Sequence, residues 1–253
     1  MASHPSFSIV APVYGVERYI ANCADSLLGQ TYDNIQFIFV NDGTKDASIA
    51  LLEKLIDEKY SFLKDRIVIV NKHNEGLPAA RRTGMEYVTG DYVLHVDSDD
   101  WVEKDMVAKI AAKVVETDSD VIYFDFYKEY SSRSKLDREK DYTADSKMKF
   151  IWGLFNYKAY GYVWNKCVKR SVYEKNDIRF PSYGMHEDIY LMAQLLDKGL
   201  NVPGGDMGQI LKYGLLIAAC ALVSLIFGAS CGIATSRASA GFARNLRHDM
   251  YHK

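Results

Sequence analysis

Short apolar runs alternate with charged segments from the N-terminus to about Asn201. The runs are rich in β-branched and aromatic residues and stop at turn-forming residues, which is typical of buried strands. The predicted strands are 7–13, 35–40, 67–70, 92–96 and 121–126. Apolar positions three or four residues apart predict helices between and after them, over 16–28, 44–60, 76–90, 101–117 and 187–198. Strands alternating with helices predict an α/β fold with a mostly parallel sheet.

Polar and glycine residues mark the expected ends of these helices. Thr44 is expected to cap the helix 44–60, with Asp46 in its first turn. Pro78 occupies an early helical position, where its missing N–H costs nothing, and Gly90 is expected to end that helix. The polar stretch 128–149 predicts a surface excursion.

The pattern changes in the last fifty residues. No charged residue occurs between 213 and 236, and this span is long enough to cross a bilayer as a helix. A buried core helix is the alternative, which the length disfavours. The N-terminus has no basic segment followed by a long apolar run, so we expect no signal peptide and a cytoplasmic domain attached to the membrane through 213–236. The basic residues after the span favour the opposite orientation, or a tail lying on anionic lipid.

Composition narrows the function classes. The chain has 253 residues, is 48% hydrophobic and 25% charged, and carries a formal net charge of −2. These values exclude intrinsic disorder, and the near-neutral charge argues against a nucleic-acid partner held through many phosphates. The cysteines form no close pair and no metal-ligand spacing, which disfavours a disulfide scaffold or a zinc module; they are Cys23, Cys167, Cys220 and Cys231.

Polar side chains follow the predicted strands, at the edge where parallel sheets bind ligands. Asp97-Ser98-Asp99-Asp100 places three carboxylates in four positions, where they repel one another unless a cation intervenes. Oxygen ligands select Mg²⁺ or Mn²⁺, although a solvated turn that caps a helix at Asp100 explains the tetrapeptide alone equally well. Asp42 can accept a hydrogen bond from a base or ribose, or form an Asx turn. Of Arg81 and Arg82, one can reach a diphosphate while the other is solvated.

The sequence lacks two common phosphate-binding motifs. No G-x-G-x-x-G follows the first strand, and no G-x-x-x-x-G-K-[ST] occurs. Taken in order, the polar motifs instead resemble family 2 glycosyltransferases with the GT-A nucleotide-sugar fold, over residues 8–200. The matching segments are 11–14 with Glu17, 40–46, 74–77, 80–81, Gly84, 90–91, 97–100, 164–166 and 187–188.

The resemblance implies roles for these residues. Asp42 and the backbone around Pro12, Val13 and Tyr14 would hold the nucleotide base, which in this family is usually uracil. The donor side would also include Glu17, Arg81, Asp97 and Ser98. Asp99, with Asp97, would bind the metal that bridges to the diphosphate.

The resemblance also implies the acceptor side and the chemistry. Trp164 and Asn165 would line the sugar or acceptor side, and the pair Glu187-Asp188 would supply the base, with Asp188 preferred. A metal neutralises the leaving diphosphate while a carboxylate removes the acceptor proton, and attack from the opposite face inverts the anomeric centre. The expected partners are a UDP-sugar donor, a glycan or lipid-linked acceptor in cell-surface polysaccharide synthesis, and the membrane. His186 is expected at the surface.

The chain departs from the family pattern after Leu200. The family normally continues with a strand, aromatic residues and a basic loop, so we expect a C-terminally shortened glycosyltransferase domain over 1–202. A junction, 203–207, would lead into a hydrophobic helix and basic tail, 208–253, and the segment 207–253 resembles a fragment of an ABC exporter membrane domain. Two alternatives remain, an inactive nucleotide-sugar-binding remnant and a membrane-transport component.

Overall fold

The computed structural model describes residues 4–130, 133–137, 153, 160–181 and 187–195. The chain divides into two units, Met1–Pro203 and Gly204–Lys253, and the fold below belongs to the first. The span 213–236, the junction and the basic tail lie outside the described residues, as does His186. Within the described ranges, no helix is long and apolar enough to cross a membrane.

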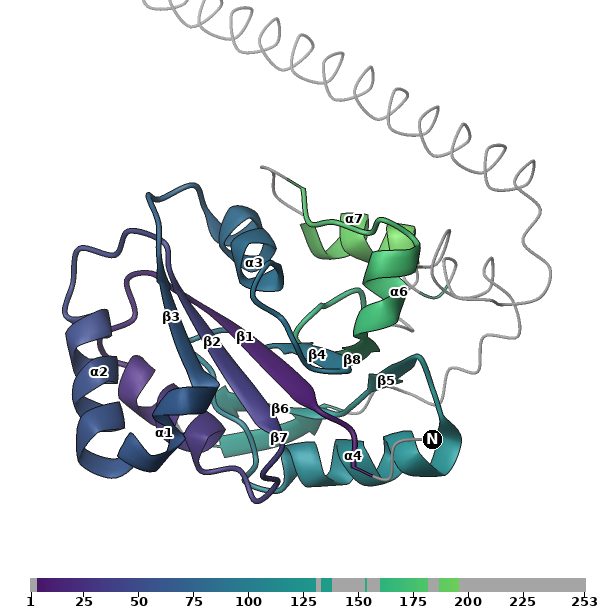
Figure 1. The fold of residues 1–253 in the computed structure, drawn as a ribbon, viewed down its shortest axis with the longest axis horizontal. Helices are drawn as coiled ribbons and strands as arrows, with labels where there is room; N and C mark the ends of the chain where they lie inside the picture. The colour runs from purple at the N-terminus through teal and green to yellow at the C-terminus, as the bar shows by residue number, and fades with distance from the viewer. Residues whose placement is uncertain (1–3, 131–132, 138–152, 154–159, 182–186, 196–253) are drawn as a thin grey trace, which may run out of the picture. The chain divides into compact units, whose positions relative to one another are not determined.

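Six strands form the central sheet, in the order β3-β2-β1-β4-β8-β5 (Figure 1). Pairing is parallel from β3 through β2 and β1 to β4, whereas β8 runs antiparallel to both of its neighbours. Five of the six strands therefore point the same way, which confirms the predicted mostly parallel sheet. The strands are β1 (Phe7–Val13), β2 (Ile35–Asn41), β3 (Ile67–Asn71), β4 (Tyr92–His95), β5 (Val121–Tyr123) and β8 (Lys166–Lys169).

Helices cover both faces of the sheet (Figure 1). One face packs against α1 (Ile20–Leu28), α2 (Ser48–Lys59) and α4 (Met106–Thr117), and the short helix η1 (Ser61–Arg66) follows α2. The other face packs against α3 (Leu77–Met85), α6 (Arg170–Lys175) and α7 (Glu187–Gln194). Because side chains alternate along a strand, Ile9 and Ala11 join the first core while Val10 joins the second.

Two helices begin later than predicted because the loops before them bind each other. Val16 donates its backbone N–H to the Ser48 hydroxyl, so α1 begins at Ile20 and not at residue 16. The prediction that Thr44 caps the second helix was wrong. The carboxylate of Asp46 accepts hydrogen bonds from the Ser48 backbone and from the Thr44 hydroxyl, and α2 begins at Ser48.

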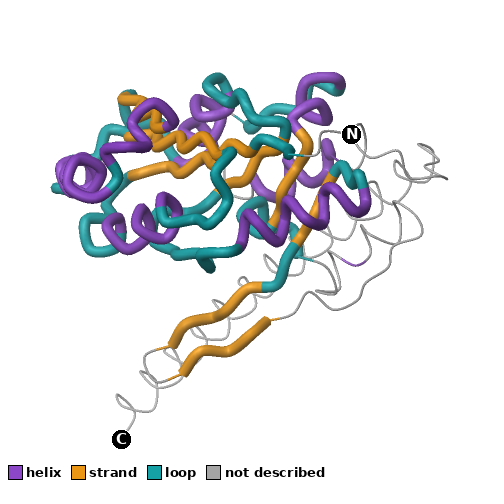
Figure 2. The backbone as a smooth tube through the Cα atoms, turned by 60° about the horizontal axis from the view of Figure 1, so that its bottom comes forward, coloured by secondary structure: helices purple, strands orange, loops and turns teal. Residues whose placement is uncertain are grey.

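Other predicted boundaries also move. The helix predicted to reach Gly90 ends at Met85, and Asp100 is not a cap, since α4 begins only at Met106. The strand predicted over 121–126 is in fact two, β5 and β6 (Phe126–Tyr130). β6 pairs with β7 (Arg133–Asp137) in a separate hairpin that projects from the main sheet (Figure 2).

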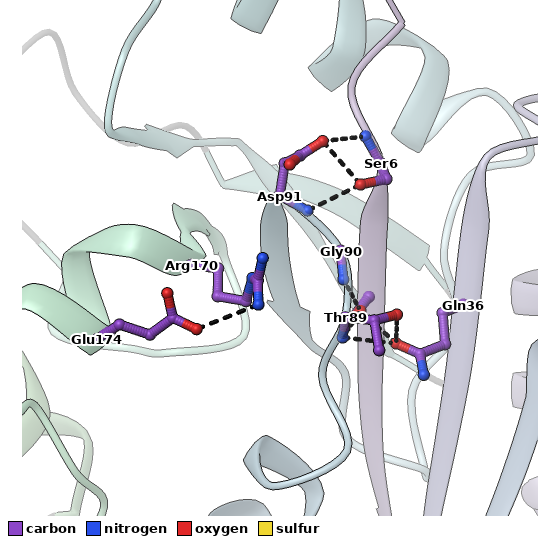
Figure 3. Close-up of polar contacts among 8 residues, drawn as sticks. Ser6, Gln36, Thr89, Gly90, Asp91, Arg170 and Glu174 are labelled. Atoms are coloured by element: carbon purple, nitrogen blue, oxygen red, sulfur yellow. Dashed lines mark hydrogen bonds and ion pairs between the residues drawn. The ribbon is translucent and has the colours of Figure 1, made fainter. Parts of the chain in front are cut away.

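Hydrogen bonds at the amino ends of β1, β2 and β4 fix these strands relative to one another (Figure 3). Asp91 accepts from both the backbone and the hydroxyl of Ser6, and Gly90 donates to the Ser8 hydroxyl at 2.9 Å. A Cβ on Gly90 would lie 2.6 Å from the Ser8 nitrogen, so only glycine fits this close approach. The opposite, carboxyl ends of the same strands carry the polar motifs.

Candidate functional site

The predicted donor-side residues gather at one edge of the sheet. Pro12 and Val13 end β1 and Tyr14 directly follows it, Asp42 directly follows β2, and Asp97 follows β4 after one residue. The strands are parallel and in register, with Val13 opposite Asn41 and Val10 opposite His95, so these ends lie side by side. Ligands bind at such an edge in open α/β sheets.

Asp42 is buried, with 3% of its surface exposed, and its carboxylate anchors the loop that leads into α3. It accepts hydrogen bonds from the Lys72 ammonium at 2.8 Å, the Glu75 backbone at 3.1 Å and the Gly76 backbone at 2.8 Å. The turn after β2 is made by Asn41, whose side chain accepts from the Thr44 backbone. A carboxylate has about four acceptor positions, so Asp42 keeps one for a ligand.

The loop after β1 presents one aromatic ring and is held by polar contacts. Tyr14 is 53% exposed, and the next residue, Gly15, has φ +69°. Glu17 accepts from the Ala47 backbone at 3.3 Å and donates its own N–H to Asp46 at 3.1 Å. Glu17 therefore joins two loops, while the Tyr14 ring stays free to stack on a planar group.

Arg81 brings together three predicted site carboxylates that are far apart in the sequence. It comes from α3 and is only 1% exposed. Its Nη2 lies 2.7 Å from Asp97, and its Nη1 lies 3.1 Å from both Glu187 and Asp188 at the start of α7. The guanidinium thus joins the end of β4 to the predicted catalytic pair.

The surroundings of Asp188, the predicted base, shift its pKa. Burial raises its pKa above the ordinary value, the Arg81 charge opposes this rise, and Glu187 and Asp97 add to it. A hydrogen bond from the Val163 backbone also stabilises the ionised form. A carboxylate with a raised pKa takes up a proton more readily, which suits a general base.

Asp99 and Asp100 are exposed beside partly buried Asp97. Partial burial, together with the charges of Asp99 and Asp97, raises the pKa of Asp100 to about 6, which shows that negative charge gathers at this turn. The described residues contain no group of three or more metal-binding side chains. Mg²⁺ and Mn²⁺ often take only one or two carboxylates and complete their shell with substrate phosphates, so Asp97 and Asp99 fit such an ion.

A loop of aromatic residues adjoins Asp188 through Val163. Tyr162 stacks between Tyr160 and Trp164, with ring centroids 5.4 and 5.0 Å apart. Trp164 is partly exposed, as a residue lining the acceptor side requires, but Asn165 is fully buried and its side-chain oxygen accepts from Lys166 at 2.7 Å.

Sequence reasoning assigned no role to two residues that shape this site. Lys166 is 2% exposed, and its ammonium also donates to the backbone oxygens of Tyr160 and Tyr162, each at 2.8 Å. His95 is buried against the Phe180 ring, and neither ring nitrogen has a hydrogen-bond partner among the described residues. Burial, with the nearby Arg81 charge, lowers the pKa of His95 well below its ordinary value, so the ring is neutral. Its position at the end of β4, two residues before Asp97, was the available signal.

Two hollows in the described surface lie away from this site. They measure about 300 and 490 Å³ and adjoin α2 and η1. Neither is lined by the carboxylates around Arg81, so the candidate site rests on its converging polar groups.

Comparison with solved structures supports the fold. The TarS fragment 1–349 of S. aureus, in complex with UDP-GlcNAc, matches with a TM-score of 0.61 and 22% identity, over 75% of this chain and 52% of that one. The mannosyltransferase PcManGT from Pyrobaculum calidifontis, in complex with GDP-Man and Mn²⁺, matches with a TM-score of 0.56 and 15% identity, over 76% and 52%. These likenesses show a GT-A-like fold.

Sequence comparison identifies the family. The putative glycosyltransferase EpsH of Bacillus subtilis is 34% identical over 188 residues, which cover 73% of this chain and 53% of EpsH. The chain thus spans about half the length of this relative. The model of the family described as "Glycosyl transferase family 2" matches residues 8–177, two thirds of the chain. The chain therefore belongs to glycosyl transferase family 2.

Proposed function

We propose that this chain transfers a sugar from a nucleoside diphosphate donor, UDP-linked, to an acceptor hydroxyl with inversion at the anomeric carbon. The observation that carries the proposal is the meeting of Asp97 with Glu187 and Asp188 at Arg81, on the same sheet edge as Asp42. Complexes of structural relatives with UDP-GlcNAc and with GDP-Man and Mn²⁺ support a nucleotide-sugar donor and a divalent metal.

On the donor side, the chain positions the nucleotide. Asp42 has one acceptor position left for a base or ribose donor, and Tyr14 offers an exposed ring next to it in the sheet. Asp99 and Asp97 would hold Mn²⁺ or Mg²⁺ together with the diphosphate oxygens. When bound, the metal acts as a Lewis acid that neutralises charge on the leaving group.

On the acceptor side, Asp188 takes the proton from the attacking hydroxyl. The acceptor oxygen forms a bond to the anomeric carbon as the bond from that carbon to the diphosphate oxygen breaks, and the nucleoside diphosphate leaves with the electron pair. Attack and departure on opposite faces give inversion by a single displacement. Trp164 and Tyr162 flank Val163, which binds Asp188, so an acceptor sugar would meet an aromatic surface there.

Binding of UDP and GDP to the full chain by calorimetry, with Mn²⁺ or with EDTA, tests the donor site. UDP should bind only with the metal, and Asp99→Ala should weaken its affinity by about tenfold or more. Asp65→Ala, an exposed aspartate in η1, is the matched control and should bind as the native chain does. Absence of UDP binding by folded protein would overturn the proposal.

Turnover is tested by the slow release of UDP from UDP-GlcNAc with water as acceptor. Asp188→Asn should lower this rate by about a hundredfold with unchanged UDP affinity, because it removes only the base. Donor binding without release by the native chain would favour the alternative of an inactive nucleotide-sugar-binding remnant. The acceptor class, a glycan or lipid-linked sugar of cell-surface polysaccharide synthesis, is proposed from the family resemblance.

Membrane attachment through residues 213–236 and the exporter-like character of residues 207–253 are proposed from sequence alone. We also propose a cytoplasmic placement of the glycosyltransferase unit, because nucleotide sugars are found there, whereas the basic residues after the span favour the opposite orientation. Partition of the full chain into lipid vesicles tests the attachment. A full chain that stays in the aqueous phase would contradict it.

A further inference from the structure

We propose that Arg81 is a positioning residue that holds the base Asp188 against the donor site, and that it does not bind the diphosphate. The inference rests on the proposed function, because it assigns Arg81 a role through Asp188. It differs from the expectation that Arg81 lies on the donor side as a phosphate ligand.

Burial argues against direct contact with the donor. Arg81 is only 1% exposed, and its guanidinium already binds three carboxylates of the chain. Nη1 serves two carboxylates and Nη2 serves Asp97, so three of its five N–H groups are taken by the chain. Nε, one of the remaining donors, is itself buried without a partner among the described residues, so a diphosphate could reach it only if the surrounding protein moved.

Charge explains why the carboxylates need Arg81. The side chains of Asp97, Glu187 and Asp188 are 26%, 14% and 24% exposed, so water screens them only partly. Three partly buried negative charges around one point repel one another and are costly without a cation. The single guanidinium lies between them and holds all three together.

The backbone of Arg81 is itself fixed at both ends of α3. Asp42 binds the backbone of Glu75 and Gly76 just before the helix begins. Near its end, Gly84 lies so close to the sheet that a Cβ there would be 2.4 Å from Val10 Cγ1. The backbone of Arg81 therefore has a fixed position, and its side chain sets the position of the α7 carboxylates relative to β4.

The shape of the guanidinium matters for this role. Arginine presents a rigid planar fork of donors, so it can bind carboxylates from two elements in different directions. A lysine ammonium keeps the charge that attracts a diphosphate but is a single point on a flexible stem. Arg81→Lys therefore separates positioning from phosphate binding.

The test measures UDP affinity with Mn²⁺ and UDP release from UDP-GlcNAc by the full chain. Arg81→Lys should keep the UDP dissociation constant within about threefold and lower the release rate by about tenfold or more. Arg82→Lys, the neighbouring and partly exposed arginine, should change neither quantity. Loss of UDP affinity in Arg81→Lys, with uridine affinity kept, would show phosphate contact and overturn the inference.

A double variant adds a readout that a purely structural defect would not give. If Arg81 acts through Asp188, then Arg81→Lys combined with Asp188→Asn should release UDP no more slowly than Asp188→Asn alone. If the double variant instead releases UDP more slowly than Asp188→Asn by the factor that Arg81→Lys causes alone, the inference is overturned.

If Arg81→Lys does not fold, Glu187→Gln provides the second route. The amide oxygen can still accept from Nη1 while one negative charge is gone, so UDP affinity should stay within about threefold and the release rate should fall by about fivefold. A loss of UDP affinity would contradict positioning. Native protein that neither binds UDP nor releases it from UDP-GlcNAc overturns the proposed function itself, and this inference with it.

Discussion

At the scale of single residues, the site depends on carboxylates whose partners are already within the chain. Asp42 binds Lys72 and two backbone N–H groups, Asp46 caps α2, and Asp97 binds Arg81. These bonds order the loops before any ligand arrives. A preordered site loses less conformational entropy on binding, which favours affinity.

Asp42→Asn should destabilise the protein by about 2 kcal/mol, because the mostly buried Lys72 loses its buried carboxylate partner and keeps only the exposed one, Glu75. Urea unfolding at pH 7 measures the change in the free energy of unfolding. Asp57→Asn is the control, since the pair between Asp57 and Lys64 is 63% and 57% exposed, and its loss should cost less than about 0.5 kcal/mol. Equal losses in both variants would show that burial of the pair does not matter.

Asp46 should contribute stability that depends on pH. Hydrogen bonds from the Ser48 hydroxyl, then from Thr44 and the backbone, lower its pKa to about 2. Because the folded pKa is below the unfolded one, the contribution is complete above about pH 4 and is lost as the pH falls through about 2.

Asp46→Asn should therefore unfold more easily than the native chain by about 1 kcal/mol at pH 7, a value reduced for solvent screening. The difference should vanish near pH 2. Urea unfolding at both pH values measures it, with Asp65→Asn as an exposed control. A difference that stays constant with pH would mean that the charge of Asp46 is not its source.

At the scale of elements, α3 connects the fold to the site. It packs on the sheet through small residues, Ala79, Ala80 and Gly84, and carries Arg81 among them. Small side chains let a helix approach the sheet closely. The position of Arg81 therefore follows from the packing of the helix that bears it.

Gly84→Ala should move α3 away from the sheet, because its Cβ would lie 2.4 Å from Val10 Cγ1 and 3.2 Å from Val40 Cγ2. Overpacking should outweigh the better helix propensity of alanine and cost about 1–2 kcal/mol in urea unfolding. The rate of UDP release should fall as well, since Arg81 moves with the helix. Thr83→Ala, on the same helix and partly exposed, should leave both quantities unchanged. Native stability in Gly84→Ala would contradict the close approach.

The sequence predicted the elements whose pattern is local. The apolar runs in the sequence predicted β1 and β2, and the turn residues after them mark the sheet edge where the site lies. β8 was not predicted because its four residues begin and end with lysine, and the buried Lys166 donates to oxygens of a neighbouring loop. The contacts of Arg81 were not predicted because its partners lie 16, 106 and 107 residues away in the sequence.

At the scale of the whole molecule, both described cores lie within one unit. Their residues fall between Phe7 and Leu195, and the division of the chain comes at Pro203. The two cores share the sheet, so they are expected to unfold together. The predicted boundary near residue 202 can therefore be tested by truncation.

A chain shortened to residues 1–203 should fold on its own, with the same far-UV circular dichroism per helical residue and the same urea midpoint as the full chain. The reason is that no residue of the described cores is removed. Urea unfolding of both chains in the same detergent provides the comparison. A midpoint lower by about 1 M or more would show that residues 204–253 stabilise the first unit.

The insertion of β8 between β4 and β5 has a consequence for synthesis on the ribosome. β4 pairs with β1 on one side, but its other edge stays unpaired until residues 166–169 have been synthesised. At a synthesis rate of about 5–20 residues per second, the 74 residues from Val96 to Lys169 take about 4–15 seconds to emerge. The nascent chain thus carries an open apolar strand edge for seconds, which is the interval in which a chaperone would be needed to prevent intermolecular pairing.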